Sequence, residues 1–220
     1  MDEVFDHSQE VVNYETGRIE TKLIQPDAKP GDIRYVDYNQ DGQIDLNDRQ
    51  WIGSPFPDFD LGLNFNADYR GFDLMVFLYG VFGNEIFNGL RLGTETMDGP
   101  DNIPADIEPW TWDNPSETTP RPFYGPNDNA KAQSDRWLEN GTFLRLKNLQ
   151  FGYSFSEKIL SKTMFIDRFR IYVSGQNLIT LTKYRGYDPE MINNDVFVQG
   201  CDLATYPPVR SYMMGLQLSF

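Results

Sequence analysis

The chain has 220 residues and is strongly acidic, with 33 Asp and Glu against 19 Lys and Arg and a formal net charge of −14. A negative field of this size repels phosphate backbones and argues against nucleic-acid binding. The single cysteine, Cys201, excludes an internal disulfide framework, and no run of 18 apolar residues is present to form a transmembrane helix.

The first 60 residues are predicted to form a loop region outside any sheet. No secretory signal precedes residue 20, because the opening residues are acidic and lack an apolar run. Residues 1–30 favour coil with one short helical turn. From residue 31 to residue 51, Asp, Asn and Gly predominate around one apolar side chain, Ile44.

Residues 37–48 have the spacing of a calcium-binding loop. Oxygen-bearing residues stand at loop positions 1, 3, 5, 7, 9 and 12, namely Asp37, Asn39, Asp41, Gln43, Asp45 and Asp48. Gly42 permits the bend at position six, and Gln43 would donate its backbone carbonyl. We therefore expect a structural Ca²⁺, which fits better than Mg²⁺ because so many ligands are protein oxygens. The alternative is an Asx-rich turn without metal, held by side-chain-to-backbone hydrogen bonds.

A strict period of two begins at residue 61 and predicts a strand over residues 61–69 with one apolar and one polar face. Arg70 and Gly71 then predict a tight hairpin, because glycine suits such turns. The return strand covers residues 72–79. Its alternation is only partial, since both of its faces carry apolar side chains.

Residues 81–141 lose this periodicity and are rich in proline, which favours a long surface loop. Aromatic side chains in the loop either stack on sugar rings or pack the loop onto itself: Trp110, Trp112, Phe123 and Tyr124. Carboxylates in the loop either include a glycosidase pair or are simply solvated: Glu95, Asp98 and Glu108. Nothing in the sequence sets their separation, so the solvated loop is favoured and catalysis has no support.

Three further strands are predicted over residues 143–155, 169–176 and 212–220. In the first, Leu144 and Leu146 have the opposite parity to the apolar residues that follow, and a β-bulge near Lys147 would reconcile them. Arg145 and Lys147 either face the interior of a barrel or form ordinary ion pairs. A second long loop is expected over residues 179–208.

The strands suit the wall of a membrane barrel. Their lengths match the roughly 9–11 residues that a tilted strand needs to cross a bilayer. Short and long connections alternate, as in outer-membrane barrels. The alternative is a secreted, soluble β-sandwich that binds carbohydrate and holds a structural calcium, in which a second sheet covers the apolar face.

Several motifs, in chain order, resemble those of one transporter family. They are PGDIRYVD followed by NQDG and DR (residues 30–49), IGSPFP (52–57), YRGFDL (69–74), GVFGN (80–84), GTFLRLKNL (141–149), SGQNL (174–178) and YDPE (187–190). Together they resemble the SusC/RagA-type TonB-dependent transporters of the Gram-negative outer membrane. The resemblance covers residues 30–220.

The resemblance implies an all-β fold, in which residues 61–220 are antiparallel strands at the C-terminal end of a large barrel of roughly 22 strands. It also implies import of glycans or peptides, energy from TonB, and a SusD-type surface lipoprotein as partner. The segment that contacts TonB, the plug domain and most of the strands are not in this sequence. We therefore expect these 220 residues to be one piece of an importer, unable to transport alone.

Overall fold

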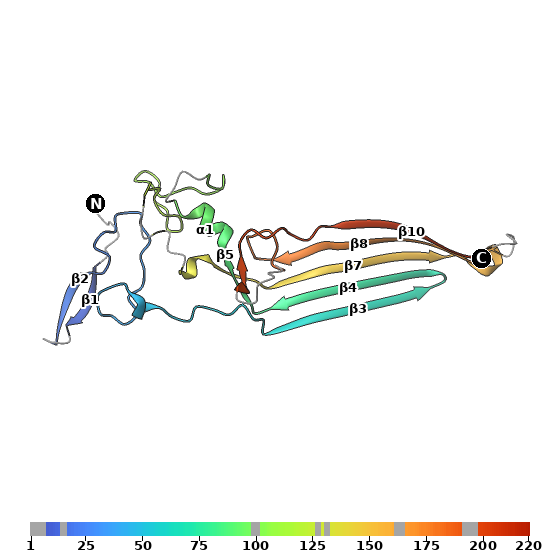
Figure 1. The fold of residues 1–220 in the computed structure, drawn as a ribbon, viewed down its shortest axis with the longest axis horizontal. Helices are drawn as coiled ribbons and strands as arrows, with labels where there is room; N and C mark the ends of the chain where they lie inside the picture. Colours follow the sequence, from blue (N-terminus) through green and yellow to red (C-terminus); the bar gives the residue numbers. More distant parts are fainter. Residues whose placement is uncertain are drawn as a thin grey trace. The chain divides into compact units, whose positions relative to one another are not determined.

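A computed structural model of the chain describes residues 8–13, 17–97, 102–125, 129, 133–160, 166–190 and 198–220. The chain forms two compact units, of which the first comprises residues 1–52 and 89–137 and the second residues 53–88 and 138–220. Each unit therefore joins segments that are distant in the sequence (Figure 1).

The first unit contains short elements connected by long irregular segments. They are β1 (Ser8–Asn13), β2 (Arg18–Leu23), the 3₁₀ turns η1 (Leu46–Asp48) and η3 (Asp135–Trp137), and the helix α1 (Gly89–Glu95). β1 and β2 form an antiparallel hairpin in which Asn13 pairs with Arg18. The prediction of coil and a helical turn in this stretch was wrong. Gly17, directly before β2, has a φ of 67°, a left-handed conformation that glycine adopts without strain.

A buried ion pair connects distant parts of the first unit. Arg121 donates from Nε to Asp32 Oδ1 over 2.7 Å, and Asn129 Nδ2 donates to the same oxygen over 2.9 Å. The neighbouring Gly31 has a φ of +86°, and a Cβ at this position would lie 2.5 Å from the ring of Trp110. Glycine is therefore required where the indole covers the backbone.

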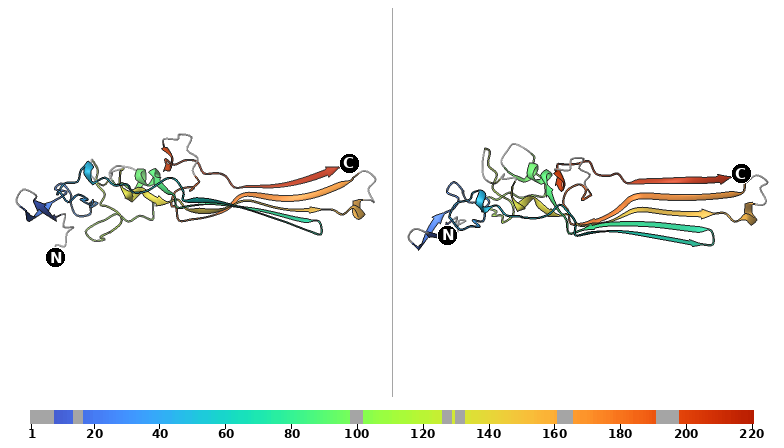
Figure 2. Two further views of the ribbon diagram at one scale, coloured as in Figure 1. Left: turned by 90° about the horizontal axis from the view of Figure 1, so that it is seen from below. Right: turned by 60° about the horizontal axis from the view of Figure 1, so that its bottom comes forward.

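The second unit is built on a five-stranded antiparallel sheet with the order β10-β8-β7-β4-β3 (Figures 1 and 2). Its strands are β3 (Phe59–Tyr69), β4 (Phe72–Phe82), β7 (Phe143–Ser154), β8 (Arg168–Thr182) and β10 (Ser211–Ser219). All five predicted strands are present, and β8 is longer than predicted. The sheet is open, because β3 and β10 are its two edges and do not pair with each other.

The predicted hairpin between the first two strands is confirmed. Tyr69 pairs with Phe72, so Arg70 and Gly71 alone make the turn. Both have positive φ, 49° and 89° respectively, as a type I′ turn requires. A Cβ on Gly71 would also lie 2.6 Å from the carbonyl oxygen of Ser154, so no other residue fits without displacing β7.

The predicted β-bulge near Lys147 is also confirmed. On β4, Phe77 and Leu78 are consecutive, whereas their partners on β7 are Asn148 and Leu146. Lys147 is therefore an extra residue that reverses the side-chain parity of β7. The pairing of β7 with β8 shifts at the same place, between Leu146 and Asn148.

One face of this sheet is apolar across all five strands. In an antiparallel ladder, directly paired residues point to the same face, so the register assigns each side chain to a face. The apolar face carries Phe59, Leu61, Leu63, Phe65, Ala67 and Tyr69 of β3; Phe72, Leu74, Val76, Leu78 and Phe82 of β4; Leu144, Leu146, Leu149, Phe151 and Tyr153 of β7; Phe169, Ile171, Val173, Ile179 and Leu181 of β8; and Tyr212, Met214, Leu216 and Leu218 of β10.

Nothing in the described structure covers this apolar face. Leu63 is 53% exposed, Val173 48% and Leu216 59%. A soluble sandwich would bury these positions against a second sheet. At the hairpin end, aromatic rings pack together on this face; Phe72 is tilted against Tyr153 at 4.6 Å and stacked on Phe151 at 5.6 Å, ring centre to ring centre.

The two segments that were predicted to be long loops contain further regular structure. β5 (Glu85–Asn88) pairs antiparallel with β6 (Leu138–Asn140) and parallel with β9 (Cys201–Asp202), which makes a three-stranded sheet in the second unit. A short helix, α2 (Glu157–Leu160), follows β7. No helix in the described part of the chain is long and apolar enough to cross a membrane.

The ion pair of Asp32 makes the first unit sensitive to acid. Burial would raise the pKa of this carboxyl, but hydrogen bonds from Arg121, the Lys29 N–H and Asn129 hold it below its ordinary value of 3.8. The stability that the ionised carboxylate contributes is therefore complete above about pH 4 and is lost as the pH falls through the lower pKa of the folded state.

We expect tryptophan emission of the chain to report this loss as a transition below about pH 4, because all four tryptophans, Trp51, Trp110, Trp112 and Trp137, belong to the first unit. Asp32→Asn should lower stability at pH 7 and flatten the profile in that acid window. A variant whose acid transition matched that of the unmodified chain would contradict this account.

Candidate functional site

The second face of the five-stranded sheet is polar and is the best candidate for a functional surface. It carries amides, hydroxyls and charged groups at positions that alternate with the apolar ones. Apolar and aromatic side chains are mixed with them, mainly on β4: Met75, Phe77, Tyr79, Val81, Phe143, Tyr172 and Met213. Its polar side chains are Asp60, Asn64, Asn66, Asp68, Asp73, Arg145, Asn148, Gln150, Ser154, Arg168, Arg170, Ser174, Gln176, Thr180, Thr182, Ser211, Gln217 and Ser219. Hydrogen-bonding groups in rows on a wide sheet suit contact with water or with a polar solute.

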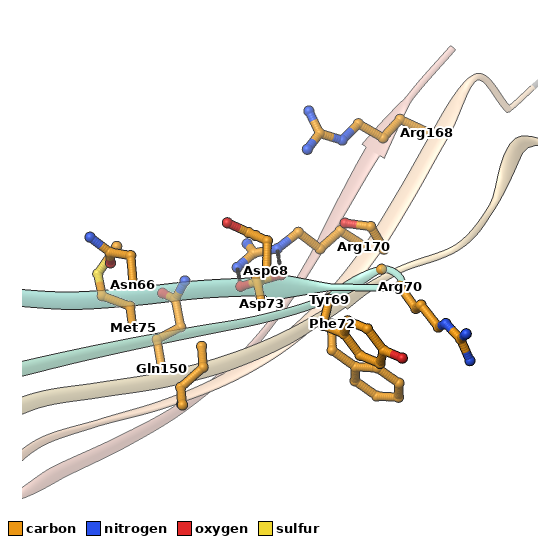
Figure 3. A pocket seen from close by; sticks show the side chains of 13 residues that line it. Asn66, Asp68, Tyr69, Arg70, Phe72, Asp73, Met75, Gln150, Arg168 and Arg170 are labelled. Carbon is orange, nitrogen blue, oxygen red and sulfur yellow. Dashed lines mark hydrogen bonds and ion pairs between the residues drawn. The ribbon is translucent and has the colours of Figure 1, made fainter.

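An ion pair spans three strands of this face near the hairpin end. Arg170 of β8 donates to both carboxylate oxygens of Asp73 of β4, over 2.9 and 2.5 Å, and its third nitrogen donates to Gln217 of β10 over 3.0 Å. The pair passes over Gly152 of β7, where a Cβ would lie 2.5 Å from the Asp73 carboxylate. The same Cβ would lie 2.8 Å from Arg170 Nη2, so glycine at this position leaves the space that the ion pair occupies. Figure 3 shows the Asp73–Arg170 pair itself.

A hollow of about 570 Å³ lies beside this pair at the hairpin end of the sheet. Most of its lining comes from the polar face, including Asp68, Gln150 and Arg168. The Arg168 side chain lies apart from the Asp73–Arg170 pair and extends in the same direction as that of Arg170 (Figure 3). The hollow thus combines acidic, basic and amide groups and has no dominant charge.

A second charged cluster lies farther along the polar face, beside the bulge. Arg145 of β7 is 1% exposed and donates to both oxygens of Asp188, each over 2.7 Å. It also donates to Glu190 over 2.8 Å and to the Thr180 hydroxyl over 2.9 Å. Its guanidinium therefore binds two carboxylates at once, with the planar fork that arginine supplies.

The bulge residue completes this cluster. The ammonium of Lys147 lies 2.5 and 2.6 Å from the two oxygens of Glu190 and 5.7 Å from the ring centre of Tyr79. The predicted ion pairing of Arg145 and Lys147 is confirmed, and that they face the interior of a barrel stays a prediction. Sequence analysis did not connect them with residues 188 and 190, because more than 40 residues separate the partners and no local pattern indicates the contact.

The six residues predicted to bind metal are held by hydrogen bonds within their own loop. Gly42 N–H donates to Asp37 Oδ2 over 2.7 Å, Asp41 N–H to Asn39 over 3.0 Å, and Gln43 N–H to Asp41 over 2.9 Å. These contacts form the Asx-type turns that the spacing predicts. The Asp45 carboxylate caps the short turn η1 by accepting from the Asn47 N–H over 2.7 Å.

Asp48 closes the loop onto its beginning. Its carboxylate accepts from the N–H of Asp45 over 2.8 Å and from that of Tyr38 over 2.7 Å. The hydrogen bond from Asp45 is the largest cause holding the pKa of Asp48 below its ordinary value, and partial burial opposes it. Among the described residues, no three His, Cys, Asp or Glu side chains already gather as a metal-binding group.

The aromatic side chains predicted in the long loop differ in exposure. Trp110 is buried at 8% exposure, whereas Trp112, 5.1 Å away and edge-on, is 71% exposed. Phe123 lies under the guanidinium of Arg121, and Tyr124 is exposed. One tryptophan therefore packs the first unit, and the other stands on its surface.

The carboxylates weighed as a glycosidase pair are engaged separately. Glu95 is buried and forms an ion pair with Arg91 over 2.9 Å, which corrects the expectation that it is solvated. Glu108 accepts from the Asn114 side chain over 3.0 Å. Asp98 lies outside the described residues.

Known proteins resemble the chain over most of its length. TonB-dependent receptor P3 of Formosa agariphila is 38% identical over 207 residues, which are 91% of this chain and 20% of that protein. TonB-dependent receptor SusC of Bacteroides thetaiotaomicron is 28% identical over 90% of this chain and 19% of that protein. No protein-family model matches the chain.

A solved structure has the same fold. The RagAB peptide importer in its closed-closed state aligns with 96% of this chain at a TM-score of 0.66 and 25% identity, and the alignment covers 21% of that chain. The present chain therefore spans about a fifth of the length of the proteins that it matches.

We expect Arg145→Met to destabilise the second unit by about 3 kcal/mol, because it leaves the Asp188 and Glu190 carboxylates without their shared cation. Arg145→Lys should cost less, since it keeps the charge but loses the fork. Urea unfolding of the chain in detergent micelles, followed by circular dichroism, measures both.

Lys183→Met is the matched control, because it removes a positive charge at an exposed position just beyond β8. It should change the free energy of unfolding by less than about 0.5 kcal/mol. Equal losses in Arg145→Met and Lys183→Met would show that the buried cluster has no special importance.

Proposed function

Because the chain belongs to the SusC/RagA-type TonB-dependent receptors, which lie in the Gram-negative outer membrane, we propose that its sheet forms part of a barrel wall through which glycans or peptides are imported. The observation that carries this proposal is the difference between the two faces of the sheet. One face is apolar on all five strands and uncovered, and the other carries most of the polar side chains, mixed with apolar ones on β4.

Lipid is the environment that suits the apolar face. Membrane barrels alternate lipid-facing and lumen-facing side chains along each strand, which is the pattern of β3. Aromatic rings at the hairpin end, such as Phe72 and Tyr153, suit the interface between lipid and water. The rival reading as a soluble carbohydrate-binding sandwich needs a cover for this face, and the described residues provide none.

The polar face is then the side that meets the transported solute. Its amides and hydroxyls can hydrogen-bond to sugar hydroxyls or to peptide groups. Its charged groups are largely paired with one another, as in the cluster of Arg145, Asp188 and Glu190. Such a surface offers many weak polar contacts, which allow a solute to bind and to leave.

The connections indicate which end of the sheet faces the outside. The two-residue turn at 70–71 and the connection from β7 to β8 lie at one end, whereas the long connections 83–142 and 183–210 leave from the other. Outer-membrane barrels have short turns in the periplasm and long loops outside. We assign residues 1–58 and the connections 83–142 and 183–210 to the extracellular side. The predicted loop bounds 81–141 and 179–208 overlap the strands, because β4 continues to Phe82 and β8 to Thr182.

Transport requires more strands than this sheet has. The edges β3 and β10 each leave backbone groups unpaired, which a bilayer does not tolerate. We therefore propose that further strands join both edges, that TonB supplies the energy, and that a SusD-type surface lipoprotein is the partner on the outside. The names of the relatives support the role of TonB, and the RagAB structure is that of a peptide importer.

The orientation of the sheet can be tested with two neighbouring residues of β3. Leu63 lies on the apolar face and Asn64 on the polar face. We expect Leu63→Arg to cost about 2–4 kcal/mol, as for arginine facing the middle of a bilayer, and Asn64→Arg to cost much less. The amount of each variant in isolated outer membranes of the native host, measured by immunoblot, reports the difference.

Asn64→Arg is the matched control, because it adds the same charge one residue away. Similar losses for both variants would contradict a lipid-facing side, and a greater loss for Asn64→Arg would reverse the assignment of the faces.

The partnership can be tested by affinity purification of the tagged protein from outer membranes of the native host. We expect a surface lipoprotein of the SusD type to co-purify in near-equal amount and to be absent from a purification of an unrelated tagged barrel. Deleting the gene should abolish uptake of labelled oligosaccharides or oligopeptides, whichever the importer takes. Unchanged uptake of both would contradict the proposed transport.

A further inference from the structure

The loop of residues 37–48 contains a buried oxygen that has no hydrogen-bond partner. Asp37 is 4% exposed, and its Oδ2 accepts the Gly42 N–H over 2.7 Å. Its Oδ1 is buried and accepts no hydrogen bond from any described residue. A buried carboxylate oxygen without a partner is costly, so this position calls for a positive group.

A second carboxylate is held at the same end of the loop. The Asp48 Oδ1 accepts from the N–H of Tyr38 over 2.7 Å and from that of Asn39 over 3.4 Å. The backbone brings Asp48 towards Asp37, because the Tyr38 N–H donates to Asp48 from the residue directly after Asp37.

We propose that this loop binds one calcium ion, with Asp37 and Asp48 at its centre. Asn39, Asp41 and Asp45 would add side-chain oxygens and Gln43 its backbone carbonyl, which gives ligands at positions 1, 3, 5, 7, 9 and 12. This inference goes beyond transport, since it concerns a structural ion in the first unit.

The arrangement of the loop explains what binding involves. The Asp41 carboxylate accepts from the Gln43 N–H at one oxygen and from the Asn39 side chain at the other. Ion binding therefore exchanges the contact with the Asn39 amide for a contact with the metal, while the backbone turn remains. Calcium suits such a set better than magnesium, because it accepts six to eight oxygens in flexible geometry, whereas magnesium keeps several waters.

The backbone of the loop is already shaped for a ligand. Gly42 is buried and has a φ of +80°, so the chain bends sharply at position six. Asp48 and the turn η1 close the far end, where the Asp48 carboxylate accepts the Asp45 N–H. A preformed loop loses little conformational entropy on binding, which favours affinity.

The test uses the full chain in detergent micelles stripped of metal with a chelator. Terbium, which replaces calcium, should show luminescence sensitised by Tyr38 within the loop, and added calcium should displace it at one site per chain. Isothermal titration with calcium alone should give the same stoichiometry. Magnesium at the same concentration should not displace terbium.

Asp37→Asn and Asp48→Asn should each weaken calcium binding at least about tenfold, because each removes a charged ligand. Mutation of residues that only support the ligands typically lowers metal affinity by about tenfold or more, so loss of a ligand should cost at least as much. Asp41→Asn, at a more open position, is the second variant if either of these fails to fold. Asp27→Asn is the matched control, since it removes an exposed charge outside the loop, and it should bind calcium as the unmodified chain does.

Absence of calcium binding in the unmodified chain would overturn the proposal and leave the loop as a turn held by hydrogen bonds. Equal weakening by Asp27→Asn and Asp37→Asn would overturn it as well. Displacement of terbium by magnesium as readily as by calcium would overturn the assignment of the ion.

Discussion

The structure depends on the requirement that each strand of the large sheet keep its apolar side chains on one face. Side chains alternate along a strand, so an error of one residue in register would exchange the faces. The bulge at Lys147 shows how this requirement is met. Without the extra residue, Arg145 would share the face of Leu149 and Phe151, and Leu144 would point to the polar side. One inserted residue therefore keeps a charged group out of the apolar face.

The same bulge helps to place the charged cluster. Because Arg145 points to the polar face, it can bind Asp188 and Glu190, and Lys147 reaches Glu190 from the bulge itself. A buried ion pair is costly to form unless its hydrogen bonds are complete, and the Thr180 hydroxyl takes a further donor of the guanidinium. The cluster thus pins the segment that follows β8 onto the sheet. Through this cluster, the side-chain parity of β7 helps to determine where the segment with Asp188 and Glu190 lies.

Short-range patterns predicted the sheet well. The alternation in β3, the Arg70–Gly71 turn and the parity change at Lys147 are local signals, and each has its expected counterpart in the structure. The hairpin of β1 and β2 was missed. β2 does alternate, with Ile19, Thr21 and Leu23 between charged residues, but β1 places Val11 and Val12 next to each other and has no period of two. β5, β6 and β9 were missed because they are two to four residues long and pair across more than 50 residues or in parallel. Such elements depend on tertiary contacts, which leave no period in a single sequence.

Of the two candidate sites, the loop 37–48 was predicted from the sequence, whereas the charged cluster around Arg145 was not. The turns of loop 37–48 follow from spacing alone, since each Asx side chain bonds a backbone group two to five residues along. The partners of Arg145 did not follow, because ion pairs across 43 residues require the fold.

Charge is distributed in a manner that fits the proposed transport. The five strands carry three acidic residues, Asp60, Asp68 and Asp73, and four basic ones, Arg145, Lys147, Arg168 and Arg170. The strands therefore carry a net charge of +1, and the rest of the chain carries −15, which gives the total of −14. A nearly neutral wall holds neither anions nor cations strongly, so a solute that passes along it meets mainly amides and hydroxyls. The acidic residues lie instead in segments that we assign to the outside, where water screens them and where divalent cations are available to bind.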